Sequence, residues 1–225
     1  MPILELRPTQ MTIGQREVTW RKRKLEKKYE KLDEEEFKEF LKEKAADVII
    51  GPGGKVYIVD GHHHTRALLE TDYNWTYVRV EKDWSSLSEE EFARRMQGPH
   101  RGRPYVWLRD ENGIQRCFAD LPRDISKLKD DPLRSIVFYL TRLKIIQKNE
   151  NFPWFGEYRI VEWLRPQLKL KDDYGRWRIW NAAKEAAYLV SRWSSQKEHL
   201  PGQRYLTQER CGKKLGKLSK YYVQR

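Results

Sequence analysis

The chain has little cysteine. Its two cysteines, Cys117 and Cys211, lie far apart, and neither belongs to a Cys-x-x-Cys pair or stands beside a histidine. A disulfide framework, a redox motif and thiol catalysis therefore have little support. A zinc site is also disfavoured, because adjacent side chains rarely supply tetrahedral angles and the other soft ligands, His100 and His199, are distant in sequence from the histidine cluster at 62–64.

Long apolar runs are also missing. No stretch of 18 apolar residues occurs, and the amino terminus, residues 1–7, lacks the apolar core of a signal peptide. Nothing indicates secretion or a membrane span, so we expect a cytoplasmic protein with no membrane partner. Hydrophobic residues still make up 39% of the chain, enough to bury one good core or two small ones.

Acidic residues are outnumbered, with 33 Asp and Glu against 45 Lys and Arg and a formal net charge of +12. Such an excess favours polyanionic partners such as nucleic acids or nucleotide phosphates. Between residues 21 and 43 the bases are interleaved with acids, which is typical of a salt-bridged helix facing solvent. Few acids interrupt the excess in residues 204–225, and we predict that this basic tail contacts DNA or RNA phosphates through Lys213, Lys214, Lys217 and Lys220.

Hydrophobic periodicity predicts an α+β domain over residues 1–98. The expected elements are a strand at 3–7, helix from 18 to 44, hairpin strands at 47–50 and 56–59, a helix at 65–71, a strand at 76–80 and a helix at 87–96 capped by Ser88. Residues 98–113 are rich in glycine, proline and arginine and are predicted to be a linker. A helical extension, 99–203, follows, with helices expected at 130–146, 152–164 and 177–193.

The most informative stretch is Asp60-Gly61-His62-His63-His64-Thr65-Arg66, here called the histidine box, which directly follows an apolar strand. Three consecutive histidines cannot share one packed face of a strand or helix, so at least one must face solvent or a ligand. Gly61 permits a positive φ, and the amides after it would open a helix, where phosphate groups bind. The alternative is an ordinary Asp-Gly turn followed by solvated histidines.

Two stretches carry a resemblance to a known family: the opening motif, Leu6-Arg7-Pro8-Thr9-Gln10 with Gly14 and Val18, and Asp60-Gly61-His62-His63. On these motifs the chain resembles the ParB/sulfiredoxin superfamily, and within it the ParB-like nuclease branch. The resemblance extends through residues 130–135 and 155–165 to cover about residues 3–168. It implies a ParB/sulfiredoxin-like N-terminal domain of the α+β class with a mainly helical C-terminal part. The superfamily includes CTP-binding partition proteins, ATP-using sulfiredoxins, free-serine kinases and nucleases.

The resemblance also implies a phosphate pocket at the strand-to-helix turn, with Gly61, His63, His64, Thr65 and Arg66 as its residues. Two arginines of the partition proteins are histidines here, which implies weaker, pH-dependent phosphate affinity. Sulfiredoxin activity is excluded, because the catalytic cysteine is replaced by His62. The serine kinases use a glutamate in an early turn as base; its nearest equivalent here, Gln10, cannot take a proton, and Glu17 could substitute only if it reaches the pocket.

We therefore expect an enzyme that transfers or hydrolyses phosphoryl groups of a nucleoside di- or triphosphate. In this interpretation His62, His63 and Glu17 are catalytic, Asp60 binds Mg²⁺ or orients a histidine, and Arg66 neutralises charge in the transition state. The secondary site candidates are Gln10, Asp131, Arg134 and Glu157.

Two alternatives stay open. One is a DNA-binding protein or ParB-like nuclease, in which a histidine activates water or protonates the leaving oxygen while Asp60 and acids at 130, 131 or 157 bind metal. The other is a noncatalytic module that binds a nucleotide as a switch. A simpler interpretation is that the acids at 130, 131 and 157 are residues at a helix start or on the surface. Arg134 would then be only the intrahelical partner of Asp130. Nothing in the sequence indicates an oligomeric state.

Overall fold

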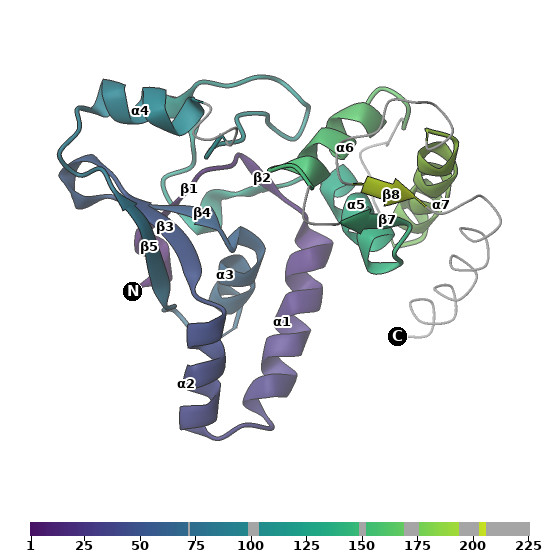
Figure 1. Cartoon of the computed structure of the whole chain (residues 1–225). Helices are drawn as coiled ribbons and strands as arrows, with labels where there is room; N and C mark the ends of the chain where they lie inside the picture. Colours follow the sequence, from purple (N-terminus) through teal and green to yellow (C-terminus); the bar gives the residue numbers. More distant parts are fainter. Residues whose placement is uncertain (72, 99–103, 149–151, 169–175, 194–202, 206–225) are drawn as a thin grey trace. The chain divides into compact units, whose positions relative to one another are not determined.

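The computed structural model shown in Figure 1 describes residues 1–71, 73–98, 104–148, 152–168, 176–193 and 203–205. The chain forms two compact units, Met1–Asp131 and Pro132–Arg225. The division comes later in the chain than the boundary expected near residue 98. The reason is that Tyr105, Val106 and Leu108 enter a buried cluster together with Tyr57 and Phe92 of the first unit.

The first unit is built on a four-stranded mixed sheet with the order β1-β4-β3-β5. The strands are β1 (Leu6–Pro8), β3 (Ala46–Ile50), β4 (Val56–Asp60) and β5 (Val78–Asp83). β3 and β4 pair antiparallel around a short 3-10 turn, Pro52–Gly54, as the sequence predicts for this hairpin. β1 pairs parallel with β4, and β5 pairs parallel with β3. The early chain thus lies beside β4, the strand that leads into the histidine box.

Four helices accompany this sheet: α1 (Gln15–Tyr29), α2 (Glu34–Glu43), α3 (His62–Leu69) and α4 (Glu89–Gln97). The helix expected from 18 to 44 is two helices, because Asp33 starts a new one. Its carboxylate accepts the amide of Glu36 at 2.9 Å, and Glu36 accepts the amide of Asp33 at 3.2 Å. Ser88 caps α4 by accepting the amide of Glu91, as predicted.

Short elements complete the first unit. The expected strand at 3–7 begins as a 3-10 turn, Ile3–Glu5, and becomes extended only at Leu6. β2 (Thr12–Ile13) pairs parallel with β6 (Lys129–Asp130), and 3-10 turns occupy Phe118–Asp120 and Ile125–Lys127. The β2–β6 pair ties the end of this unit to the segment just before α1.

The sheet has a buried layer on each face, because successive side chains of a strand point to opposite sides. Val48 and Ile58 belong to the cluster that includes residues of α1, α2 and α3, whereas Ile49 and Tyr57 belong to the cluster formed with α4 and residues 105–108. β4 is consequently covered on both sides up to Asp60, whose side chain is exposed. This fixes the strand end from which the histidine box departs.

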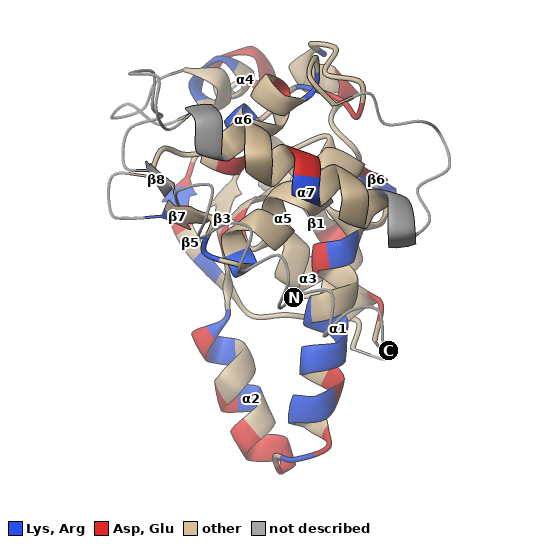
Figure 2. Ribbon diagram, turned by 90° about the vertical axis from the view of Figure 1, so that its right-hand side faces the viewer, with Lys and Arg blue, Asp and Glu red and all other residues tan. Residues whose placement is uncertain are grey.

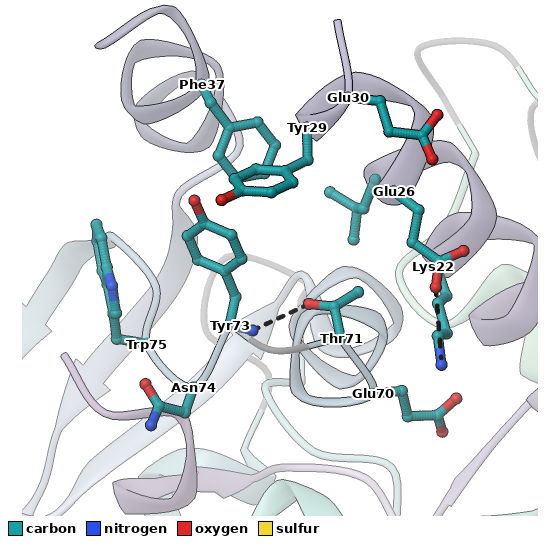
Figure 3. Close-up of a pocket in the computed structure, with 11 residues that line it drawn as sticks. Lys22, Glu26, Tyr29, Glu30, Phe37, Glu70, Thr71, Tyr73, Asn74 and Trp75 are labelled. Atoms are coloured by element: carbon teal, nitrogen blue, oxygen red, sulfur yellow. Dashed lines mark hydrogen bonds and ion pairs between the residues drawn. The ribbon is translucent and has the colours of Figure 1, made fainter. Parts of the chain in front are cut away.

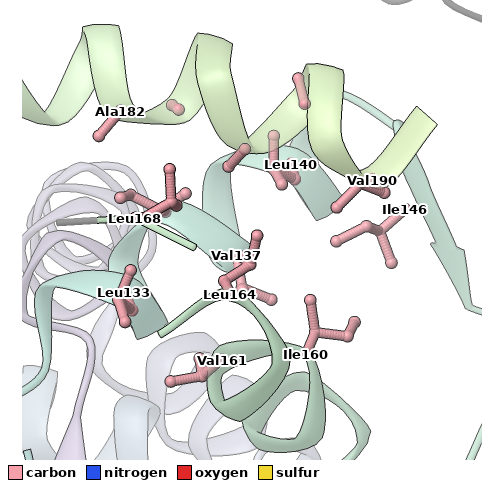
Figure 4. Packing of buried hydrophobic residues seen from close by; sticks show 14 of the residues in the cluster. Leu133, Val137, Leu140, Ile146, Ile160, Val161, Leu164, Leu168, Ala182 and Val190 are labelled. Carbon is pink, nitrogen blue, oxygen red and sulfur yellow. The ribbon is translucent and has the colours of Figure 1, made fainter. Parts of the chain in front are cut away.

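The second unit is mainly helical, as expected. It contains α5 (Pro132–Arg142), α6 (Gly156–Leu164), α7 (Arg176–Trp193) and the antiparallel pair β7 (Ile146–Lys148) and β8 (Gln203–Tyr205). Its aliphatic core includes Val137, Leu140, Ile160, Leu164 and Val190 (Figure 4). Within the described parts of the chain, no helix is long and apolar enough to cross a membrane. The lysines predicted for the basic tail lie outside the described residues.

Candidate functional site

The histidine box forms the turn between β4 and α3. Gly61 has φ 96° and ψ 5°, a left-handed backbone conformation that residues other than glycine rarely adopt. Its amide donates a 2.7 Å hydrogen bond to Asp60 Oδ1, and the box then enters α3 at His62. The first amides of a helix have no acceptor within the helix and form its positive end. The predicted geometry of the turn is therefore present, with one exposed carboxylate at its edge.

His62 is a buried hydrogen-bond acceptor. Its Nε2 atom accepts the backbone N–H of Thr9 at 3.1 Å, while the Thr9 hydroxyl donates to Ile58 O at 2.9 Å. Complete burial lowers the pKa of His62 to about 3, because a charged ring would lose its hydration. The ring is therefore neutral, with its proton assigned to Nδ1 by the bond that Nε2 accepts. This position gives His62 a structural contact, joining the start of the chain to α3.

His63 connects α3 to the first turn of α1. Its Nε2 atom accepts the amide of Gly14 at 3.1 Å and lies 3.6 Å from Glu17 Oε2. Arg21, one turn later on α1, donates to the other carboxylate oxygen of Glu17 from Nε at 2.9 Å and Nη2 at 2.7 Å. Glu17 is almost fully buried. The structure thus brings Glu17 to the box, which the sequence left conditional.

The two imidazoles hold the segment of residues 9–14, here called the strap, at both ends. Gln10 lies inside the strap and is buried, with its Nε2 atom donating to Thr12 O at 2.9 Å. The amide of Trp107 donates to Thr9 O at 2.9 Å, which is a further contact at the start of the strap. Gln10 therefore stabilises the strap internally. The sequence analysis missed the strap as a unit, although Thr9 and Gly14 stand in the opening motif that carried the resemblance.

His64 and Thr65 carry buried polar atoms without a hydrogen-bond partner in the described part of the chain, at His64 Nε2 and Thr65 Oγ1. Burial lowers the pKa of His64 to about 4, and the charges of Arg21 and Lys44 add to this effect. The His64 ring meets Phe40 edge-on, with 6.4 Å between ring centroids. His64 is therefore a neutral ring against an aromatic neighbour.

Arg66 is engaged in the fold. Its Nη1 atom donates to Ser126 O at 2.8 Å and to Ile125 O at 3.1 Å, and its Nε atom donates to Glu70 Oε1 at 3.1 Å. The guanidinium thus clamps the 3-10 turn at 125–127 onto α3. A phosphate that binds Arg66 would have to share it with these carbonyls.

The acids near residue 130 belong to the first unit. Asp130 Oδ1 accepts the amide of Gln15 at 2.8 Å and so caps α1. Asp131 is buried, and its amide donates to Ile13 O at 2.8 Å. Both acids therefore lie in the β2–β6 connection at the start of α1, where the amide of Gly14 reaches His63.

Arg134 and Glu157 come together in the second unit. Arg134 Nη2 lies 3.5 Å from Glu157 Oε1, and Lys148 Nζ also pairs with this oxygen. The Arg134 guanidinium stacks over Tyr158, with its carbon 5.5 Å from the ring centroid. Glu157 thus neutralises both Arg134 and Lys148. These ion pairs explain Arg134 and Glu157 as residues that stabilise the second unit.

A pocket of the first unit lies away from the histidine box. It has a volume of about 560 Å³ and is bounded by α1, by Phe37 of α2 and by the chain that follows α3 (Figure 3). Tyr29, Phe37 and Tyr73 form one wall, with the Phe37 and Tyr73 rings 4.9 Å apart. Glu70, the residue that ends α3, lines it, but no residue of the histidine box does. The histidine box therefore lies outside this pocket.

The described residues contain no group of three or more His, Cys, Asp or Glu side chains placed to hold a metal ion. Cys117 is exposed, while Cys211, His100 and His199 lie outside the described residues. Magnesium commonly uses one or two carboxylates together with substrate phosphates. Asp60 offers one carboxylate of this kind, so the residues present fit an ion that arrives with a phosphate group.

Comparisons with known proteins identify a family and similar solved structures. A family model described as "Putative ParB-like nuclease" matches residues 1–166. The fold is similar to the crystal structure of protein Atu1540 from Agrobacterium tumefaciens, with a TM-score of 0.71 and 27% sequence identity over 90% of this chain and 95% of that one. No curated protein sequence matches significantly.

Proposed function

The chain belongs to the ParB-like nuclease family, and from this membership we propose that its histidine box binds a phosphate group and promotes transfer or hydrolysis of the phosphoryl group. The single observation that carries the proposal is the contact between His63 Nε2 and Glu17 Oε2, 3.6 Å apart beside the first turns of α1 and α3. A histidine next to a buried carboxylate is a suitable acid and base, and a helix N-terminus suits an anion.

Phosphate binding is supported by the amides that follow Gly61 and by the positive end of α3. Asp60 stands at the same edge and would repel a phosphate. A magnesium ion held by Asp60 and the phosphate oxygens would remove this repulsion and withdraw charge from the transferred group. The donor in this proposal is a nucleoside di- or triphosphate.

Proton transfer falls to His63. A proton taken up at Nε2 would be stabilised by Glu17 and would end the hydrogen bond from Gly14, so protonation couples to the strap. His62 acts as a positioning residue, because its neutral ring holds the other end of the strap at Thr9. Arg66 contributes positive charge from its place on α3 while holding the turn at 125–127.

The test is a panel of ATP, ADP, CTP and GTP with magnesium, measured by thermal shift and phosphate release. We expect one nucleotide to stabilise the wild type and to be turned over, with turnover lost in His63→Ala, Glu17→Gln and Asp60→Asn. Glu90→Gln, an exposed carboxylate change on α4, is the matched control and should behave as wild type. Absence of both shift and turnover with every nucleotide would refute the proposal. Binding without turnover would identify a nucleotide switch instead.

A second candidate, hydrolysis of nucleic-acid phosphodiesters, is favoured by the description of the matching family and by the net charge of +12. The same groups would serve, with His63 protonating the leaving oxygen and Asp60 holding the ion. Cleavage of DNA and RNA by the same four variants separates the two candidates. Cleavage that depends on His63 and Asp60, without nucleotide turnover, would establish the nuclease.

A further inference from the structure

Helix α1 carries a row of cations along one face. The spacings between its members are four, three, one and three residues, which places them on one side of a helix with 3.6 residues per turn. The members are Arg16, Trp20, Arg23, Lys24 and Lys27. Val18 and Leu25, on the other side, are buried. Figure 2 shows the basic residues as blue bands along α1. We call these five residues the α1 stripe.

A charged helix face is usually a salt-bridged, solvated surface, but Glu17 and Glu26 of α1 pair with cations outside the stripe. Glu17 pairs with Arg21, and Glu26 lies 3.8 Å from Lys22. Both of these cations lie off the stripe. Across the part of the chain that the structure describes, Arg23, Lys24 and Lys27 are exposed and form no ion pair.

The neighbouring helix provides a contrast. On α2, Lys38 pairs with Glu34 at 2.8 Å and with Glu35 at 2.9 Å, and Lys42 pairs with Glu39. The cations of α2 are therefore neutralised locally, although both helices come from the same interleaved stretch of sequence. Of these two helices, α1 is the one with exposed cations that no acid of its own helix neutralises.

The aromatic residue of the stripe supports the same surface. Lys24 Nζ lies over the Trp20 ring, 5.0 Å from its centroid. A cation held over an indole keeps its charge exposed at the surface while its aliphatic stem covers apolar area. A membrane-binding helix would instead need several exposed apolar side chains along one face. Trp20 is the stripe's single apolar member, so the chemistry favours a soluble polyanion.

We propose that the α1 stripe binds the phosphate backbone of a nucleic acid. From Arg16 to Lys27 the stripe runs about 16 Å along the helix at a rise of about 1.5 Å per residue. Duplex DNA carries one negative charge per about 1.7 Å of axis, so several phosphates lie within that length. The stripe begins in the first turn of α1, the turn that Gly14 and Glu17 connect to His63. The inference holds whether or not the histidine box is catalytic.

The test uses the full-length protein with Arg23, Lys24 and Lys27 all changed to Gln, which retains helix propensity. Binding to a labelled DNA duplex is measured by fluorescence anisotropy across a salt titration. Log affinity falls as log salt rises, and each lost phosphate contact should make this slope less steep by about 0.9. For the triple variant we expect a slope less steep by up to about 3. We also expect binding at least about ten-fold weaker at 0.1 M salt.

The matched control carries Lys44→Gln, Lys82→Gln and Lys127→Gln, which remove the same net charge from exposed positions of the first unit outside α1. Its slope should differ from that of the wild type by no more than the change expected for about one phosphate contact. Equal slopes for the two triple variants would overturn the proposal and assign binding to overall charge or to residues 204–225. Loss of binding to vesicles of anionic lipid or to polyglutamate, with DNA binding intact, would overturn it in favour of a different partner.

The stripe and the histidine box are tested separately. The triple α1 variant should keep the nucleotide-induced thermal shift, and His63→Ala should keep the wild-type salt slope for DNA. A failed nucleotide panel together with a reduced slope would leave the stripe established and the box refuted. A successful nucleotide panel together with an unchanged slope would establish the box and refute the stripe.

Discussion

The imidazole of His63 accepts a 3.1 Å hydrogen bond from the amide of Gly14, a residue 49 positions earlier in the chain. Gly14 stands immediately before α1, so the ring caps this helix by accepting one of its first amides. The residue that we propose as the acid and base is therefore also part of the framework. Variants of His63 must be analysed for stability as well as for activity.

We expect His63→Ala to lower the free energy of unfolding by about 1–3 kcal/mol, because a partly buried amide loses its acceptor. His63→Gln keeps an acceptor oxygen at a similar reach and should lose less. Urea denaturation of both proteins measures the difference. Equal stability of the wild type and His63→Ala would show that solvent satisfies the Gly14 amide.

Acid should destabilise the protein over a defined pH range. In the folded state burial lowers the pKa of His62 to about 3 and that of His64 to about 4, below the ordinary value of 6.5. Between pH values of about 3 and 6.5, these two histidines bind more protons in the unfolded chain than in the folded protein. The stability of the folded protein therefore falls as the pH decreases below about 6.5, and it continues to fall toward a pH of about 3. The combined loss should reach several kcal/mol.

The change that tests this pH dependence is His62→Gln, which removes one titrating ring. Denaturation at several pH values between about 4 and 7 should give a shallower slope of stability against pH for this variant than for the wild type. Parallel slopes would contradict the assignment of the effect to His62. Exposed Lys82→Gln serves as a control whose slope should match the wild type.

Replacement of Gly61 should cost stability through the backbone. At φ 96°, an alanine would be strained by about 1–2 kcal/mol, and its Cβ would also lie 3.4 Å from the Cα and Cβ atoms of Ala46. Asparagine tolerates the left-handed region better and should cost less than alanine. Thermal denaturation of both variants checks the order, and a smaller loss for alanine would show that side-chain volume, not φ, limits this position.

Arg66→Met should destabilise the first unit by about 1–3 kcal/mol, since the carbonyls of Ile125 and Ser126 lose a charged donor. Lysine restores one charge but not the planar pair of donors, and it should recover only part of the loss. Hydrogen exchange at residues 125–128 localises the effect. Unchanged protection there in Arg66→Met would disprove the clamp.

Periodicity and turn chemistry predicted most of the first unit. The β3–β4 hairpin and the cap of α4 by Ser88 depend on neighbours in sequence, and both are present. The position of the break between α1 and α2 was not predicted, although the capping box of Asp33 and Glu36 is visible in the sequence. The later position of the unit boundary depends on Tyr105 and other distant packing partners, which no local pattern specifies.

For the candidate site, the sequence predicted a strand-to-helix turn, which is present, and the resemblance suggested the residues. The left-handed Gly61 follows from residue type alone, as does a helix after it, although α3 begins at His62 and not at residue 65. The unequal environments of His62, His63 and His64 do not, because burial and hydrogen-bond partners come from the strap and from α1. The engagement of Arg66 with residues 125 and 126 is likewise a long-range contact that the local sequence does not reveal.

The parallel pairing of β1 with β4 has a consequence for the order of folding. The β3–β4 hairpin closes a short loop, whereas β1 must reach a strand about fifty residues away, a step that is slower because its loop-closure entropy is larger. The strap follows β1 and is held by rings that exist in place only once α3 has formed. We therefore expect the hydrogen bonds between the histidine box and the strap to form after the β3–β4 hairpin.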